Sequence, residues 1–245
     1  MDLRLPCPLR AALTAALALA ACAREGAPPV SPADSAVEPQ VVAPAAPAPP
    51  GSVALAAVFP TAGRYALSGV QSLNGARLAV EDLNAAGGVA GRPLALLEYR
   101  TGSFFLDARQ AARLAADAGA LAIVGSNSSD LSMAIAQEAE ARGLVQISNV
   151  STAQDLTWDP ATGLDRPFVF RVCSTDVVMG TLLAAFARQE LGARRAAVLY
   201  EVGRPYSARL ARSFLGRFRD PAAGRTAAEF AYLTLETDFR AQLRA

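Results

Sequence analysis

The segment from Ser68 to Leu94 constrains the fold more than any other part of the chain. It begins with Ser68 and Gln71, whose spacing is that of a capping box at the start of a helix. Gly87 and Gly88 near its far end suit the left-handed turn that ends a helix. Apolar residues recur between them at helical spacing, at Leu73, Ala76, Val80 and Leu83. We therefore predict one amphipathic helix in this segment.

Predicted strands lie on both sides of this helix, Val53–Phe59 before it and Leu94–Tyr99 after it. Strand, helix and strand in this order form a βαβ crossover. Further strands are predicted at Ala120–Val124, Leu144–Ile147, Phe168–Arg171, Ala196–Tyr200 and Thr226–Leu233. Helices are predicted at Val70–Ala86, Asp107–Ala118, Leu131–Arg142, Val177–Leu191 and Tyr206–Phe218. Such regular alternation predicts an α/β fold with parallel sheets covered by helices on both faces.

The composition excludes several classes of chemistry. The chain has 245 residues, is 52% hydrophobic and has a formal net charge of +1, so its charge gives no reason to expect a nucleic acid partner. It contains no histidine, which removes Ser-His-Asp and Cys-His nucleophile pairs and the commonest zinc ligand. It also contains no lysine, and hence no phosphate-binding Gly-x-x-x-x-Gly-Lys loop. The cysteines at positions 7, 22 and 173 lack metal-ligand spacing, so we expect no metal and no cofactor.

Residues 1–21 have the pattern of a bacterial signal peptide. Arg4 and Arg10 give a basic start, and the apolar run that follows to Ala21 is too short to span a bilayer, which takes about 20 residues. The sequence Leu-Ala-Ala-Cys22 resembles a bacterial lipobox. That resemblance implies cleavage before Cys22, lipidation of Cys22 and attachment to a bacterial membrane through acyl chains. The alternative is a plain secretory signal cleaved near Ala21.

Residues 22–51 are rich in proline and alanine and contain no aromatic residue. A high density of proline favours an extended chain without packing partners. We therefore predict a tether that holds the folded part away from the membrane. Packing of this segment as a strand is disfavoured by its prolines.

From Asn74 to Leu94 the chain reads Asn-Gly-Ala-Arg-Leu-Ala-Val-Glu-Asp-Leu-Asn-Ala-Ala-Gly-Gly-Val-Ala-Gly-Arg-Pro-Leu. This sequence resembles the first helix of type I periplasmic binding proteins, especially the branched-chain amino-acid (Leu/Ile/Val) binding proteins of ABC importers. The resemblance runs from about Ser52 to Ala245. It implies two lobes with Rossmann-like parallel sheets, lobe one over 52–172 and part of lobe two over 173–245. The family's pattern continues beyond the position of Ala245, so we expect a C-terminally truncated chain with an incomplete second lobe. The alternative is a genuinely short, rearranged protein.

One candidate ligand loop covers residues 125–130, Gly-Ser-Asn-Ser-Ser-Asp. Ligands of open α/β sheets bind beyond the carboxyl ends of strands, and this loop leads from a predicted strand straight into a helix. The free N–H groups at a helix start favour an anion such as a carboxylate. The other interpretation is that Ser128, Ser129 or Asp130 caps the helix. The resemblance assigns Ser129 to the serine whose hydroxyl holds the ligand carboxylate.

A second candidate loop, Ser148 to Ala153, resembles the family's Pro-Ala-Ala-Thr or Pro-Ser-Ser-Thr loop. In the family a backbone carbonyl of this loop takes the ligand ammonium group, and the threonine hydroxyl bridges to the carboxylate. The resemblance places these roles on Val150 and Thr152. Asn149 stands where the family usually has proline, and Val150 is bulkier than the usual residue.

Three further residues are candidates through the resemblance. Tyr65 lies where a tyrosine or tryptophan packs over the ligand side chain, although it could be an ordinary surface aromatic residue. Asp176 matches an aspartate near the crossover between lobes, and it would either face a ligand ammonium group or cap the helix that follows. Tyr206 matches a tyrosine that contacts the ligand from lobe two.

These observations predict an extracytoplasmic solute-binding lipoprotein of an ABC importer. Two lobes would close by a hinge on a small ligand, an amino acid, an amide or a similar molecule, and present a closed surface to a membrane permease. We expect a periplasmic location with a lipid anchor in the cell membrane or outer membrane. The alternative is a ligand-sensing or cell-envelope lipoprotein of the same fold without a transport role.

Catalysis is the third hypothesis, and we predict that the protein is not an enzyme. Paired carboxylates could be sought at Glu138 and Glu140 or at Glu81 and Asp82. Both pairs lie on predicted helices, where solvated surface charge is the expected interpretation. The loop after the first strand also lacks the glycine pattern of a dinucleotide-binding site.

Overall fold

A computed structural model describes residues 40–233 and 236–244, which all belong to one compact unit. The predicted signal peptide over 1–21, the lipidation site Cys22 and most of the predicted tether lie outside these residues. Among the helices described, none is both long and apolar enough to cross a membrane.

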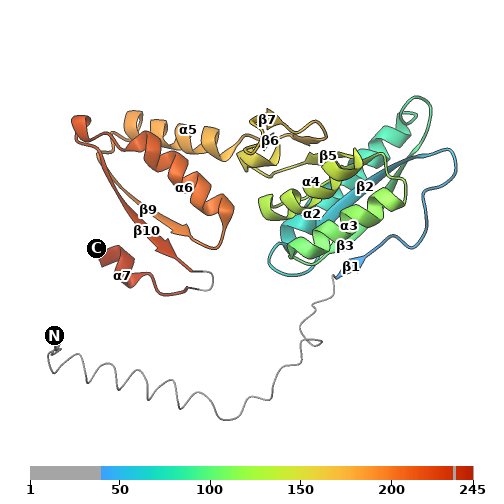
Figure 1. The fold of residues 1–245 in the computed structure, drawn as a ribbon, viewed down its shortest axis with the longest axis horizontal. Helices are drawn as coiled ribbons and strands as arrows, with labels where there is room; N and C mark the ends of the chain where they lie inside the picture. Colours follow the sequence, from blue (N-terminus) through green and yellow to red (C-terminus); the bar gives the residue numbers. More distant parts are fainter. Residues whose placement is uncertain (1–39, 234–235, 245) are drawn as a thin grey trace, which may run out of the picture. The chain divides into compact units, whose positions relative to one another are not determined.

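The larger sheet has six strands, which Figure 1 shows side by side, and only its first strand is antiparallel to its neighbour. In spatial order the strands are β1 (Val41–Val42), β3 (Leu94–Thr101), β2 (Val53–Pro60), β4 (Ala122–Val124), β5 (Val145–Ser148) and β8 (Val169–Arg171). All the parallel strands end at the same edge of the sheet, where the loops to the helices begin. This edge positions the candidate ligand loops.

Three helices cover the two faces of this sheet: α2 (Ala66–Ala85), α3 (Phe105–Asp117) and α4 (Ser129–Arg142). Alternate residues of β2 divide between two core clusters, because successive side chains of a strand point to opposite faces. Ala56 and Val58 pack with residues of α3 and α4, whereas Ala57 and Phe59 pack with Leu73 of α2. The central strand β2 is thus buried on both sides, as the parallel arrangement predicts.

The start and the buried stripe of α2 differ from the sequence prediction. The helix begins at Ala66 with Tyr65 as its N-cap residue, so the predicted capping box is wrong. The Ser68 hydroxyl instead donates a hydrogen bond to the Tyr65 carbonyl oxygen at 3.2 Å, inside the first turn. Leu73 is buried, but Leu83 is 46% exposed. The stripe is only partly covered because α2 packs mainly on β2 and β3.

The end of the predicted tether also differs from its prediction as an unpacked chain. Val41 and Val42 form β1, which pairs with Thr101 and Arg100 of β3. The Gln40 backbone N–H donates to the carboxylate of Asp107 at 2.8 Å. An uncovered edge of β3 would leave backbone groups unpaired, and this short strand satisfies some of them despite the surrounding prolines.

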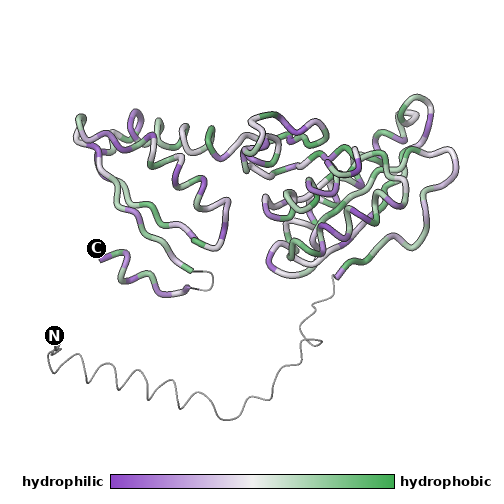
Figure 2. The backbone as a smooth tube through the Cα atoms, viewed as in Figure 1, coloured by the Kyte–Doolittle hydropathy of each residue, from purple (hydrophilic) through white to green (hydrophobic). Residues whose placement is uncertain are grey.

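A second, two-stranded parallel sheet consists of β9 (Arg195–Glu201) and β10 (Thr226–Tyr232). Both strands carry apolar residues along most of their length (Figure 2). Helices α5 (Asp176–Gln189) and α6 (Pro205–Phe218) pack closely together, because Gly180 has no side chain to meet Ser213. The remaining short elements are η2 (Gln154–Leu156), β6 (Trp158–Asp159), β7 (Leu164–Asp165), η3 (Pro221–Ala223) and α7 (Arg240–Arg244).

The carboxylate of Glu138 on α4 is buried rather than solvated. Its side chain is 8% exposed and is surrounded by Arg109 at 2.7 Å, Arg113 at 3.1 Å and Arg142 at 3.5 Å. The prediction of solvated charge is therefore wrong for Glu138. Glu140 accepts a hydrogen bond from the Phe168 backbone N–H at 3.1 Å. Glu138 ties α3 to α4, which fixes the helix that leads out of the first ligand loop.

We expect Glu138→Gln to lower the free energy of unfolding by about 1–2 kcal/mol at pH 7, since hydrogen bonds to a charged group are lost while the arginines stay partly solvated. The hydrogen bond from Arg109 is the largest cause of a pKa below the ordinary 4.5 of this carboxyl. Its stabilisation is therefore present above pH 4.5 and is lost as the pH falls through the lowered value. In urea unfolding, the difference in the free energy of unfolding between Glu138→Gln and the unmodified chain should therefore be smaller at pH 3 than at pH 7. Glu81→Gln, at an exposed position of α2, is the control and should change stability little at either pH.

Candidate functional site

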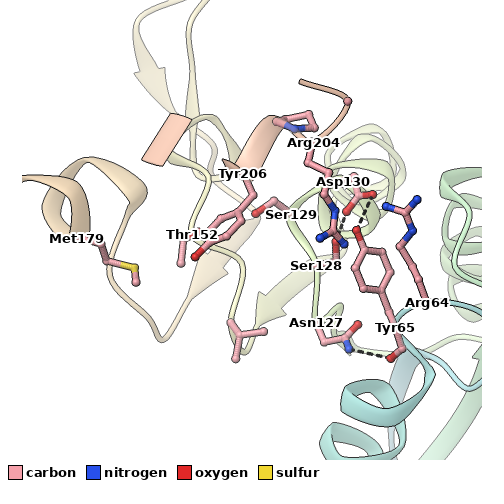
Figure 3. A pocket seen from close by; sticks show the side chains of 13 residues that line it. Arg64, Tyr65, Asn127, Ser128, Ser129, Asp130, Thr152, Met179, Arg204 and Tyr206 are labelled. Carbon is pink, nitrogen blue, oxygen red and sulfur yellow. Dashed lines mark hydrogen bonds between the residues drawn. The ribbon is translucent and has the colours of Figure 1, made fainter. Parts of the chain in front are cut away.

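Loops from both sheets line a cavity of about 420 Å³ (Figure 3). They follow the carboxyl ends of β2, β4, β5 and β9, the position at which α/β sheets bind ligands. The first turn of α5 adds one side chain. The lining residues are Arg64, Tyr65, Asn127, Ser128, Ser129, Asp130, Val150, Thr152, Met179, Gly203, Arg204, Pro205 and Tyr206.

Of the six residues predicted to contact a ligand, five line this cavity and one does not. The five come from four separate loops and are Tyr65, Ser129, Val150, Thr152 and Tyr206. Asp176 is fully buried and is absent from the lining. Ser129 and Thr152 are nearly buried, whereas Val150 and Tyr206 present about half of their surface to solvent.

The N-terminus of α4 opens into the cavity without a side-chain cap. Ser128 is the N-cap residue, and its side chain makes no capping hydrogen bond. Its hydroxyl donates instead to the carboxylate of Asp130. The first backbone N–H groups of a helix have no partner within the helix, so they remain available to an anion. Ser129, at 6% exposure, adds a hydroxyl at the same position.

Thr152 and Asp176 are joined to each other across the loop after β5. The Thr152 hydroxyl donates to the Asp176 carboxylate, and the Asp176 backbone N–H donates to the Thr152 carbonyl oxygen at 2.8 Å. The Nε of Arg209 on α6 lies 3.5 Å from the other carboxylate oxygen. Burial raises the pKa of Asp176, and the contacts with Thr152 and Arg209 oppose that rise. Asp176 does not cap α5, because the N-cap residue is Thr175, whose side chain accepts from the Val178 N–H.

Tyr65 forms one wall of the cavity. Its hydroxyl donates to Asp130 at 3.4 Å, and its backbone N–H donates to the Ser103 hydroxyl at 3.1 Å. The guanidinium carbon of Arg204, from the loop after β9, lies 5.3 Å from the centroid of the Tyr65 ring. This distance is within the range of a cation–π contact. Tyr65 thus contacts chain segments that are far apart in the sequence.

A buried network of hydroxyl groups fixes the two serine-rich loops relative to each other. The Ser132 and Ser151 hydroxyls lie 2.7 Å apart, and the Ser132 and Ser148 hydroxyls both donate to the Ser126 carbonyl oxygen at 3.0 Å. The Gln146 amide bridges the same region by donating to Gly125 at 2.9 Å and Ser132 at 3.0 Å. Sequence reasoning missed these positioning residues. Their one signal was the polar residue Gln146 within the predicted strand Leu144–Ile147, in a sheet expected to be covered on both faces.

Residues 52–245 match the family described as periplasmic binding protein. The chain belongs to that family. Leu/Ile/Val-binding protein homolog 3 of Brucella melitensis is 26% identical over 151 residues, which are 62% of this chain and 40% of that protein.

This periplasmic binding protein is also similar in fold to two solved structures. The leucine-binding protein LivK of Thermotoga maritima is 30% identical with a TM-score of 0.68, over 78% of this chain and 52% of that one. LivJ of Streptococcus pneumoniae, solved with isoleucine, is 24% identical with a TM-score of 0.69, over 79% of this chain and 53% of that one. The α/β fold is therefore that of the type I periplasmic binding proteins of the branched-chain amino-acid group. The chain spans about half the length of these solved relatives.

The chemistry available in this periplasmic binding protein is recognition by hydrogen bonds and charge. Across residues 40–233 and 236–244, no group of three or more His, Cys, Asp or Glu side chains is arranged to hold a metal ion. The cavity lining offers hydroxyls, an amide, two guanidinium groups and one carboxylate. These groups suit a small polar ligand that carries a carboxylate.

Proposed function

We propose that this protein binds a small amino-acid-like ligand in the cavity lined by Tyr65, Ser129, Thr152 and Tyr206. The observation that carries the proposal is the uncapped start of α4, which presents backbone N–H groups and the Ser129 hydroxyl to the cavity. A ligand carboxylate at this position would accept hydrogen bonds from both. The Val150 carbonyl oxygen would accept a hydrogen bond from the ligand ammonium group, and Thr152 would contact the ligand beside it.

The proposed mechanism is hinge closure of two lobes. Residues of the six-stranded sheet would bind the ligand carboxylate first, and Tyr206 and Arg204 would contact the ligand from the second sheet. Closure adds those contacts, so the ligand shifts the population toward the closed state. We further propose that the closed form delivers its ligand to the permease of an ABC importer outside the cytoplasm. The predicted lipid anchor at Cys22 would hold the protein at the membrane.

Calorimetric titration of the full chain tests the binding proposal. The panel is leucine, isoleucine, valine, glutamate and glutamine, and at least one of them should bind. For that ligand, Ser129→Ala should weaken binding about tenfold or more, because a hydrogen bond to a charged carboxylate is lost. Ser174→Ala, at an exposed position outside the cavity, is the matched control and should bind as the unmodified chain does. The absence of heat with every member of the panel would contradict the proposal.

A further inference from the structure

Two arginine side chains line the same wall of the cavity. Arg64 comes from the loop after β2 and Arg204 from the loop after β9. Their guanidinium carbons lie 5.8 Å and 5.3 Å from the centroid of the Tyr65 ring, and both side chains reach toward that ring in Figure 3. The cavity therefore has cationic groups where a side chain packed on Tyr65 would end.

The carboxylates near these two arginines do not occupy all of the guanidinium N–H groups, so some remain available to a ligand. Asp130 is the one acidic residue in the lining, and it already accepts hydrogen bonds from Tyr65 and Ser128. Glu201 lies 3.4 Å from the Nε of Arg204, and it is not part of the lining. Arg64 makes no hydrogen bond or ion pair with any other residue that the structure describes.

Such a wall disfavours an apolar ligand side chain. Closure over a leucine-like side chain would remove water from the Arg64 guanidinium group without supplying an acceptor, which costs free energy. A carboxylate would instead accept paired hydrogen bonds from an arginine fork. The first carboxylate site at α4 adjoins this wall, since the Tyr65 hydroxyl bonds to Asp130 in the first turn of that helix.

We propose that the ligand carries two acidic groups, as in an acidic amino acid or a short dicarboxylate, and that Arg204 determines this specificity with help from Arg64. The inference rests on the proposed function and deepens it. One carboxylate binds at the start of α4. The second binds to the arginines beside Tyr65. Arg204 comes from the second sheet, so the second carboxylate also favours closure.

Titration of the full chain with L-glutamate, glutarate and L-leucine tests this inference. Glutamate or glutarate should bind at least tenfold more tightly than leucine. Arg204→Gln should weaken binding of the acidic ligand at least tenfold more than it weakens binding of leucine, because only the acidic ligand loses a charge-assisted contact. Arg64→Gln, in an exposed loop, should act in the same direction. Arg217→Gln makes the same charge change at an exposed position of α6 outside the cavity and is the control.

The outcomes separate this inference from the proposed function. Tighter binding of leucine than of both acidic ligands would overturn the inference and leave the proposed function standing. Equal weakening of leucine and glutamate by Arg204→Gln would also overturn it, since that result indicates a structural role. No binding of any of the three ligands would contradict both. Thermal unfolding of each variant is the control that distinguishes a loss of binding from a loss of folding.

Discussion

Replacing Gly69 by alanine is expected to lower the free energy of unfolding by about 2–3 kcal/mol, because the added methyl group overpacks a buried contact. Gly69 lies in the first turns of α2, where the helix crosses the end of β2. A Cβ atom there would overlap the carbonyl oxygen of Pro60 and lie 2.9 Å from its carbonyl carbon. Both neighbours are backbone atoms in a buried strand, so helix or strand must move. Urea unfolding followed by circular dichroism measures the loss.

Gly75, two turns further along α2, is the matched control. A Cβ atom at this position would meet nothing within 4 Å. Gly75→Ala should therefore raise the free energy of unfolding by about 0.5–1 kcal/mol, the usual gain for alanine over glycine inside a helix. Changes of the same sign in both variants would contradict the packing of α2 on β2.

Replacing Thr152 by valine is expected to lower the free energy of unfolding by about 2–3 kcal/mol at pH 7, because a buried carboxylate loses a hydrogen-bond donor. Valine keeps the shape of threonine, so the loss reports the bond to Asp176 rather than packing. The same variant should weaken ligand binding, since Thr152 lines the cavity. Chemical unfolding and calorimetric titration of one preparation measure both effects.

The stability lost by Thr152→Val should depend on pH in a defined direction. Burial already raises the pKa of Asp176 above its ordinary 3.8, and loss of the Thr152 bond, which lowers it, should raise it further. A carboxyl group whose pKa is higher in the folded state stabilises the fold while it is protonated and costs stability as it ionises. The difference between Thr152→Val and the unmodified chain should therefore be small at pH 3 and grow toward pH 7. Thr152→Ser keeps the hydroxyl and is the control; an equal loss in both variants would contradict the role of this hydrogen bond.

The elements of the fold could be predicted from the sequence because periodicity reports burial along single segments. The strand predicted as Val53–Phe59 is Val53–Pro60, and the helix predicted as Asp107–Ala118 is Phe105–Asp117. The predicted start of α2 was wrong because the helix begins at Ala66, after an N-cap residue, Tyr65, that makes no side-chain capping hydrogen bond and so has no capping-box pattern. The strand at Val41 was missed because its partner, the free edge of β3, exists only in the folded sheet.

In the candidate site too, only the residues that a local sequence pattern marks could be predicted. The family's sequence pattern predicted Ser129 and Thr152, since both belong to short segments whose sequences resemble the family's. Both residues line the cavity. Arg64 and Arg204 could not be predicted because their shared feature is a common distance from the Tyr65 ring, although 140 residues separate them in the chain. The burial of Glu138 likewise depends on arginines from a different helix.

Hydrogen exchange of the full chain with and without ligand tests whether one ligand contacts loops from both sheets. The probes are L-glutamate and L-leucine, each used at a concentration that saturates binding by calorimetry. A bound ligand should slow amide exchange in residues 127–130 and 203–206 together, while exchange at the exposed end of α2 over 78–85 stays unchanged. Protection of only one of these two loops, or of neither, by a ligand that binds would show that the two sheets do not share a ligand site.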